Sequence, residues 1–126
     1  MDKERREQIA TDLVHACFKI HKELGPGLLE KVYEICLSHE LEKKGYNVAR
    51  QVSVPIVYDG KEFKEGFKLD LLIDEMVICE IKAQENIHPV WQAQIISHLK
   101  LTGCKLGFLV NFNVSLIKNG IRRFVN

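Results

Sequence analysis

Two acidic residues and a lysine stand inside apolar stretches of this 126-residue chain. Asp70 interrupts one apolar run, and Glu80 and Lys82 lie near the end of the next. Charged groups in a buried strand are costly unless they are compensated. Side chains alternate along a strand, so Glu80 and Lys82 point to the same face. A turn at Asp74–Glu75 folds the two runs into a hairpin, which brings Asp70 close to Glu80.

This combination predicts a divalent cation with a lysine beside it. A small number of hard oxygen ligands, completed by water, suits Mg²⁺ or Mn²⁺. Asp70 and Glu80 are the expected ligands, together with the backbone carbonyl of Ile81. Lys82 would orient the attacking water or neutralise charge that develops on a phosphate. The alternative interpretation is a structural salt bridge between Lys82 and one of the two acids, because the spacing by itself is loose.

A second group of candidates lies in the motif G-x-x-E-x-x-Y, residues 27–33. Gly27 allows a tight turn before a helix. Glu30 falls in the first helical turn, where the helix dipole favours a carboxylate, and it also lies at the margin of the apolar stripe, from which it could reach a site over the sheet. Tyr33 is expected to pack in the core with a partner for its hydroxyl group.

Further polar residues are candidates for substrate contacts. Gln94 and His98 lie one turn apart on a helix and either face the metal site or a phosphate, or form a partly exposed helix side. Gln51 begins an apolar strand and either contacts substrate or lies on the surface. Lys100 belongs to a set of basic residues that either hold phosphates or simply face solvent.

The hydrophobic periodicity predicts the elements that position these residues. Helices are expected near residues 3–24, 28–44 and 89–102, and strands at residues 48–58, 62–73, 76–82 and 104–111, with a last strand at 121–125. Tight turns at Asp59-Gly60 and Asp74-Glu75 make the first three strands antiparallel, and Pro55 suggests an edge or bulge position in the first of them. The helix between the third and fourth strands implies a right-handed parallel crossover. The expected fold is therefore α/β, a mixed sheet flanked by helices in the order α-α-β-β-β-α-β.

Length and composition predict a single domain over residues 1–126, with 46% hydrophobic and 28% charged residues. The net charge of +1 gives no overall basic signal for nucleic acid. The four cysteines have no metal-ligand spacing and are expected to be reduced core thiols of a cytoplasmic protein. No apolar stretch is long enough to span a membrane, and no secretory signal is expected.

On these residues the chain resembles the GxxExxY protein family, part of the PD-(D/E)XK nuclease-like superfamily. The motifs are Gly27–Tyr33, Leu69-Asp70-Leu71, Cys79–Ala83, Gln92–Gln94, Leu99–Gly103, Asn111–Asn113 and the ending Arg123–Asn126. The resemblance implies a restriction-endonuclease-like core that binds metal through Asp70 and Glu80, with Lys82 catalytic. It also implies that Glu30 joins the metal site and that Gln94 is a recurrent site glutamine. One departure is His98, where members of the family often carry tyrosine.

Two functions follow as hypotheses. The first is a Mg²⁺-dependent nuclease, or nuclease-like phosphodiesterase, that acts on DNA. The second is a non-catalytic module that uses the same fold to bind nucleic acid or a protein partner. A third hypothesis is a structural subunit of a larger complex, or an obligate homodimer that buries a strand edge; a homodimer would also present two sites to a duplex.

Overall fold

The computed structural model describes residues 2–126. The elements are α1 (Asp2–Leu24), α2 (Glu30–Lys43), β1 (Val48–Tyr58), β2 (Lys61–Ile73), β3 (Val77–Lys82), α3 (Val90–Thr102), β4 (Leu106–Asn111), a short 3₁₀ helix η1 (Ile117–Asn119) and β5 (Ile121–Val125). Their order and type agree with the sequence-based prediction, and the boundaries differ by two residues at most.

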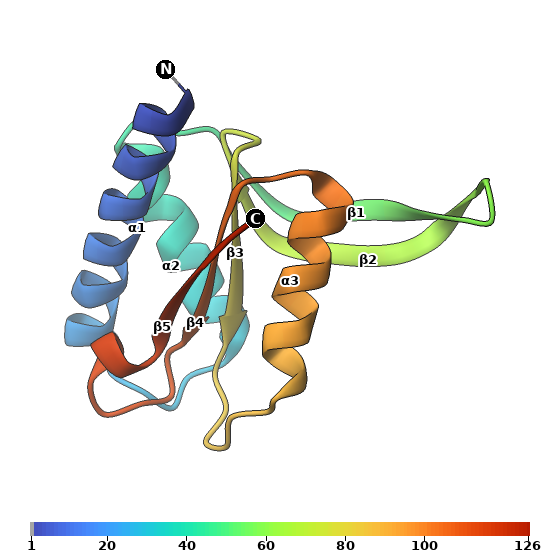
Figure 1. Ribbon diagram of the computed structural model, residues 1–126. Coiled ribbons are helices and arrows are strands. Elements are labelled where there is room, and N and C mark those ends of the chain that lie inside the picture. Colours follow the sequence, from blue (N-terminus) through green and yellow to red (C-terminus); the bar gives the residue numbers. More distant parts are fainter. Residues whose placement is uncertain (1) are drawn as a thin grey trace.

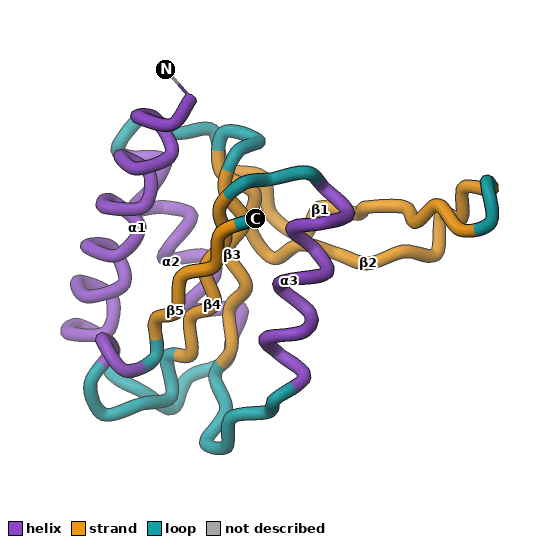
Figure 2. Tube along the Cα trace, in the orientation of Figure 1, coloured by secondary structure: helices purple, strands orange, loops and turns teal. Residues whose placement is uncertain are grey.

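The strands form one sheet in the order β1-β2-β3-β4-β5. The pairs β1–β2, β2–β3 and β4–β5 are antiparallel, whereas β3 and β4 are parallel and joined through α3. Helices α1 and α2 cover one face of the sheet and α3 covers the other (Figures 1 and 2). The mixed, helix-flanked sheet predicted from the sequence is confirmed.

Each face of the sheet has its own apolar core. The larger core packs α1 and α2 on the sheet and includes Leu13, Leu37 and Phe108. The smaller core packs α3 through Ile95 and Leu99. Burial of these side chains is the main favourable contribution to the fold. The two cores also fix the positions of the β2 and β3 residues that lie between them.

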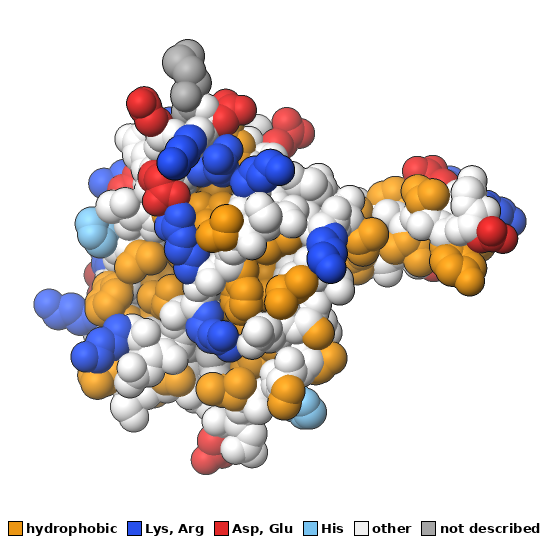
Figure 3. Space-filling view, in the orientation of Figure 1, with side chains coloured by type: hydrophobic (Ala, Val, Ile, Leu, Met, Phe, Trp, Pro, Cys, Tyr) orange, Lys and Arg blue, Asp and Glu red, His pale blue; other side chains and the backbone are white. Residues whose placement is uncertain are grey.

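The β1–β2 hairpin extends well beyond the body of the molecule as an arm (Figure 1). Its turn at Asp59-Gly60 has positive φ at both residues, as the sequence predicts. The register shifts between Val54 and Ile56, beside Pro55, so the expected bulge on an edge strand is confirmed. Gly66 is required opposite this bulge, because a Cβ atom there would lie 1.9 Å from the carbonyl oxygen of Val54. The arm carries both acidic and basic side chains (Figure 3).

The alternation of side chains along β2 breaks at Asp70. Leu71 packs in the core under α1 and α2, whereas Leu69, two residues earlier, packs in the core under α3. In an ideal strand the two would share a face. The partner strand is distorted at the same point, since Gln51 has a φ of 50° and lies between the paired positions Arg50–Leu71 and Val52–Leu69. This distortion interrupts the regular pairing of β1 and β2 at Asp70.

Two further sequence expectations concern thiols and membrane spans. The four cysteines are free; Cys17 and Cys79 are buried, and Cys36 and Cys104 are partly buried. Burial raises the pKa of the Cys17 and Cys79 thiols, as expected for unreactive core residues. Among residues 2–126, no helix has the length and apolar character needed to cross a membrane.

Candidate metal centre

The first acid of the predicted site lies where β2 and β3 separate. Their paired positions end at Leu71–Cys79, so the following residues of β3 have no backbone partner on β2. Asp70 compensates with its side chain, because its Oδ2 accepts a hydrogen bond of 2.8 Å from the backbone N–H of Ile81. Its Oδ1 lies 3.4 Å from Nε2 of Gln51. The carboxylate is therefore fixed beside the end of β3.

The second acid, Glu80, points to the α3 face and is only 7% exposed. Its Oε1 is hydrogen-bonded to Nδ1 of His98 at 3.0 Å. The imidazole of His98 stacks on Phe67, with ring centroids 4.2 Å apart. The helix α3 and the strand β2 thus hold His98 in place, and His98 in turn orients Glu80. His98 therefore lies on the α3 face of the sheet, beside Glu80.

The surroundings of Glu80, including Asp70, change the pKa of its carboxyl group. Burial raises the pKa of the Glu80 carboxyl, the hydrogen bond to His98 lowers it, and the neighbouring Asp70 carboxylate raises it again, with a net upward shift. A buried carboxyl near a second carboxylate is destabilised in its charged form. A cation between the two groups would relieve this cost, which is why paired acids of this kind are suited to divalent ions.

Lys82 lies two residues after Glu80, at the end of β3 and on the same face. Its Nζ lies 5.6 Å from the centroid of the Trp91 ring, a cation–π contact with the first turn of α3. Among residues 2–126, Lys82 forms no ion pair with Asp70 or Glu80, and the ion-pair partner of Glu80 is His98. The salt-bridge interpretation of the acid–lysine set therefore does not describe this structure.

A buried acid on α2 was not among the residues predicted from the sequence. Glu34 is 5% exposed, and its Oε2 accepts hydrogen bonds of 3.1 and 3.0 Å from Arg50. Its Oε1 accepts one of 2.6 Å from Gln51, which in turn approaches Asp70. Glu34 thus stabilises the positive-φ conformation of Gln51. The sequence signal was weak, consisting of an acid next to Tyr33 within the stripe that continues through Leu37.

The remaining predicted residues lie at different distances from this centre. Glu30 is exposed and lines an open pocket together with Glu34, Arg50 and Asp70. Gln94 is exposed one turn before His98, on the same side of α3. Lys100 is exposed and lies about 200° from His98 around the helix, on its opposite side. The structure thus gathers Asp70, Glu80, Ile81, Gln51 and His98, with Lys82 and Glu30 at the margins.

The comparison with family models gives one match. A model of the PD-(D/E)XK nuclease superfamily covers residues 7–124. The chain belongs to this superfamily. Comparisons with curated proteins and with solved structures found no match. PD-(D/E)XK nucleases generally use divalent metals. The superfamily assignment therefore accounts for the fold. It also raises the question of whether the oxygen atoms at Asp70 and Glu80 suit a divalent metal ion.

The donor set of this PD-(D/E)XK domain fits a small, hard cation. Asp70 and Glu80 supply two carboxylates, and the carbonyl of Ile81 adds a neutral oxygen at the same edge of β3. Within residues 2–126 there is no cluster of three or more histidine, cysteine, aspartate or glutamate side chains arranged for a metal ion. The fit therefore requires water in the remaining positions, as is usual for Mg²⁺. Among the described residues no cysteine thiolate is available for a soft metal at this site, since Cys79 is buried in the opposite core.

The raised pKa of Glu80 predicts how the metal-free PD-(D/E)XK domain responds to pH. Between the ordinary value of 4.5 and the raised value, the folded protein keeps a proton that the unfolded chain has released. The free energy of unfolding should therefore fall as pH rises between these two pKa values. Above the raised pKa, the folded protein bears the full cost of holding Glu80 ionised. The titratable groups beside Glu80 are Asp70 on β2 and His98 on α3, and Lys82 lies two residues further along the same face of β3.

Urea unfolding in a chelating buffer at several pH values measures this effect. Glu80→Gln keeps the hydrogen bond to His98 but cannot ionise, so it should gain stability relative to the wild type as pH rises. A constant difference between the two proteins across this pH range would show that the Glu80 carboxyl is not destabilised by its surroundings.

Proposed function

We propose that residues 1–126 form one PD-(D/E)XK domain that acts as a Mg²⁺- or Mn²⁺-dependent nuclease on DNA. The observation that carries this proposal is the coupled pair of carboxylates, Asp70 and Glu80, where β2 and β3 separate. Lys82 stands on the same strand and face as Glu80. The match to the nuclease superfamily and the Gly27–Tyr33 motif, which we assign to the GxxExxY family, support the same conclusion.

The proposed role of each site residue follows from its contacts. Asp70, Glu80 and the carbonyl of Ile81 would hold the ion, and Glu30 would add an exposed acid at the entrance of the adjoining pocket. The bound ion would supply Lewis-acid activation of the phosphate and of a water molecule. His98 keeps Glu80 oriented, and Ile81 keeps Asp70 oriented through its N–H. These hydrogen bonds fix both carboxylates before substrate arrives.

Lys82 is the proposed catalytic residue that contacts the reacting atoms. Its ammonium group lies over an indole ring and has no acidic partner in the described residues, so it is free to meet the negative charge of a phosphodiester. There it would position the attacking water and stabilise the charge that develops on the phosphate oxygens. Gln94, Gln51 and Lys100 are proposed as substrate contacts; Lys100 has the weakest support, because it lies on the far side of α3.

The proposed location of the protein is the cytoplasm. Free cysteines are typical of a reducing compartment, which supports a cytoplasmic location.

A homodimer would present two sites to a duplex. The β1–β2 arm is a surface on which to test this, since Val57 and Tyr58 near its tip are 67% and 72% exposed. Loss of the dimer on shortening the arm would support this assignment.

Incubation with DNA of several shapes tests the proposed activity. Wild-type protein is mixed with linear, nicked, branched and single-stranded DNA in Mg²⁺, Mn²⁺ or chelator. Cleavage in either metal and none in chelator is expected. Cleavage that continues in chelator, or no cleavage of any of these DNAs in either metal, would contradict the proposal.

A second candidate function is supported by the hydrogen bonds of the two acids. Asp70 and Glu80 both have hydrogen-bond partners within the protein, so the fold can satisfy these carboxylates with its own groups. A non-catalytic module that binds nucleic acid or a protein would have the same property. Fluorescence anisotropy with labelled DNA in chelator separates the two candidates. Full DNA affinity without metal, combined with no cleavage, would favour the binding module.

A further inference from the structure

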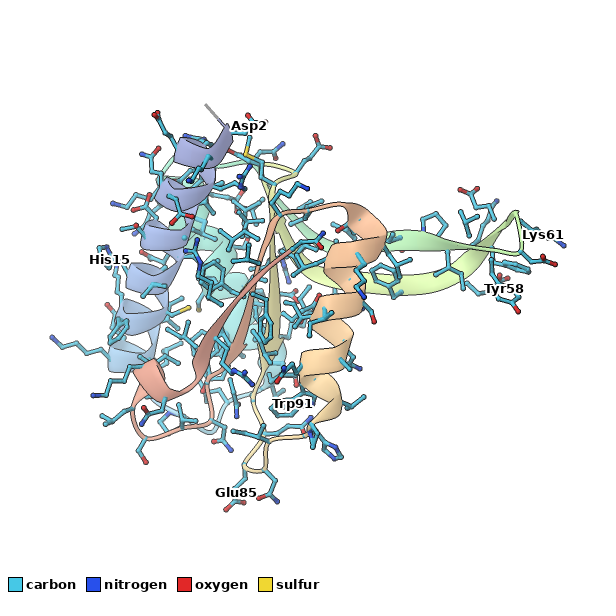
Figure 4. The ribbon with its side chains drawn as sticks, in the orientation of Figure 1. Asp2, His15, Tyr58, Lys61, Glu85 and Trp91 are labelled. Carbon is cyan, nitrogen blue, oxygen red and sulfur yellow. The ribbon has the colours of Figure 1, made fainter. Side chains whose placement is uncertain are left out.

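A second pocket lies beside the proposed metal centre, at the carboxyl ends of the parallel strands β3 and β4. Its lining includes Trp91 and Gln92 of α3, Leu109 of β4, and the residues His88, Asn119 and Arg122. Figure 4 shows Trp91 near the start of α3, close to the loop that carries Glu85. The carboxyl ends of parallel strands are a common place for ligands in sheets of this type.

The pocket and the catalytic lysine share the indole of Trp91. Lys82 lies over the face of that ring, while Trp91 also lines the pocket. The β3–β4 register pairs Glu80 with Leu109 and Lys82 with Asn111, so these four residues share the α3 face of the sheet. A molecule in the pocket would therefore be adjacent to a phosphate held at Lys82.

The chemistry of the lining suits a heterocyclic base. Trp91 and Leu109 provide apolar and aromatic surface, and Asn119 provides both a donor and an acceptor at the margin. No carboxylate lines the pocket within residues 2–126, in contrast to the acidic pocket around Asp70. Among the described residues of the lining, Arg122 supplies the single guanidinium, positioned by a 3.1 Å hydrogen bond from its Nη1 to Oε1 of Gln92.

The walls of the pocket are fixed by hydrogen bonds. The side chain of Asn111 accepts a hydrogen bond from the backbone N–H of Gln84 and donates one to its carbonyl, at 3.2 and 2.9 Å, which holds the loop before α3. The backbone N–H of Asn111 donates to the carbonyl of Gly120 at 2.8 Å. A Cβ atom at Gly120 would lie 2.1 Å from the carbonyl oxygen of Asn111, so this close approach requires glycine. A preformed pocket does not have to be ordered when its ligand binds, so little binding free energy is lost to that step.

We propose that this pocket binds one unstacked nucleobase of the DNA strand whose phosphodiester is cut at Lys82. This inference rests on the proposed nuclease function and specifies its substrate. A base inside a paired duplex has to leave its stack before it can enter a pocket, whereas an unpaired base is already accessible. The protein is therefore specific for single-stranded DNA or for unpaired segments such as frayed ends and branches.

The single tryptophan of the chain, Trp91, allows a direct binding test. Its fluorescence is followed while thymidine 5′-monophosphate or a thymidine tetranucleotide is added in chelator, with deoxyribose 5-phosphate as the probe without a base. Saturable quenching by both thymidine probes and none by deoxyribose 5-phosphate is expected. Equal quenching by deoxyribose 5-phosphate would assign the pocket to phosphate alone and overturn the inference.

Two variants near the margin of the pocket provide a matched comparison. Arg122→Leu and Lys118→Leu each remove one exposed positive charge from the C-terminal segment, but only Arg122 lines the pocket. We expect the tetranucleotide to bind about tenfold more weakly to Arg122→Leu, the effect of one charge-assisted hydrogen bond, and unchanged to Lys118→Leu. Equal losses in both variants would reduce the effect to general electrostatics and contradict a base pocket.

Cleavage assays separate this inference from the proposed function. Wild-type protein should cut single-stranded DNA at least about tenfold faster than closed duplex DNA, since unpairing costs a few kcal/mol. Cleavage without any quenching of Trp91 would overturn the pocket and leave the nuclease proposal intact. Quenching that follows the expected pattern, with no cleavage in either metal, would uphold base binding and remove the nuclease proposal.

Discussion

Lys82→Ala should lower the rate of metal-dependent DNA cleavage about 100-fold or more while leaving the fold and the binding of Mn²⁺ unchanged. The reason is that, among residues 2–126, Lys82 has no acidic partner to lose and forms no hydrogen bond through its ammonium group to the acid pair. Removing it takes away positive charge where the phosphate would react, but leaves both carboxylates in place. Initial rates at saturating metal measure the effect.

The control for Lys82→Ala is Lys22→Ala, which removes an exposed lysine from α1 in the opposite layer. This variant should cleave at the wild-type rate. Circular dichroism verifies that both variants are folded, and the fluorescence of Trp91 should change only in Lys82→Ala, because that lysine lies over the ring. Wild-type cleavage by Lys82→Ala would show that the lysine is not catalytic.

Tyr33→Ala should destabilise the protein by about 3–5 kcal/mol, the usual cost of removing a large buried ring. Tyr33 is fully buried and stacks on Phe112 with ring centroids 4.3 Å apart. Its hydroxyl donates a hydrogen bond of 2.7 Å to the carbonyl of Gly25 and accepts one of 3.1 Å from the N–H of Leu28. It therefore ties the loop between α1 and α2 to the core. Urea unfolding measures the loss.

Tyr33→Phe separates packing from hydrogen bonding at this position. It keeps the ring on Phe112 but removes the partner of Gly25 and Leu28, so a smaller loss of about 1–3 kcal/mol is expected. Both variants should retain cleavage at temperatures where they are folded. A fully stable Tyr33→Phe that has lost activity would instead assign the tyrosine of the G-x-x-E-x-x-Y motif to the chemistry.

Most of the fold was predictable because its signals are local. The tight turns at Asp59-Gly60 and Asp74-Glu75 fix two hairpins, and the helical stripe before Gly103 requires a crossover between β3 and β4. The hydroxyl partner expected for Tyr33 is also confirmed. In each case a short segment determines the backbone by itself, so the rest of the protein does not have to be known.

The features that the sequence did not predict depend on contacts between distant elements. Glu34 is buried because α2 is oriented with this acid against Arg50 and Gln51 of β1. Glu30, one turn earlier, is exposed. The face change at Asp70 depends on the positive φ of Gln51, which periodicity does not encode. Lys82 was expected beside the acids, and its contact with Trp91 arises only once α3 is packed on the sheet.

Titration of Mn²⁺ into the metal-free protein, followed by calorimetry, tests the central claim most directly, because it needs no knowledge of the substrate. The wild type should bind the ion, and Asp70→Asn, which keeps an acceptor for the N–H of Ile81, should bind it at least about tenfold more weakly, as should Glu80→Gln. Lys82→Ala should bind as the wild type does. Equal affinity in all four proteins would contradict a metal centre at Asp70 and Glu80.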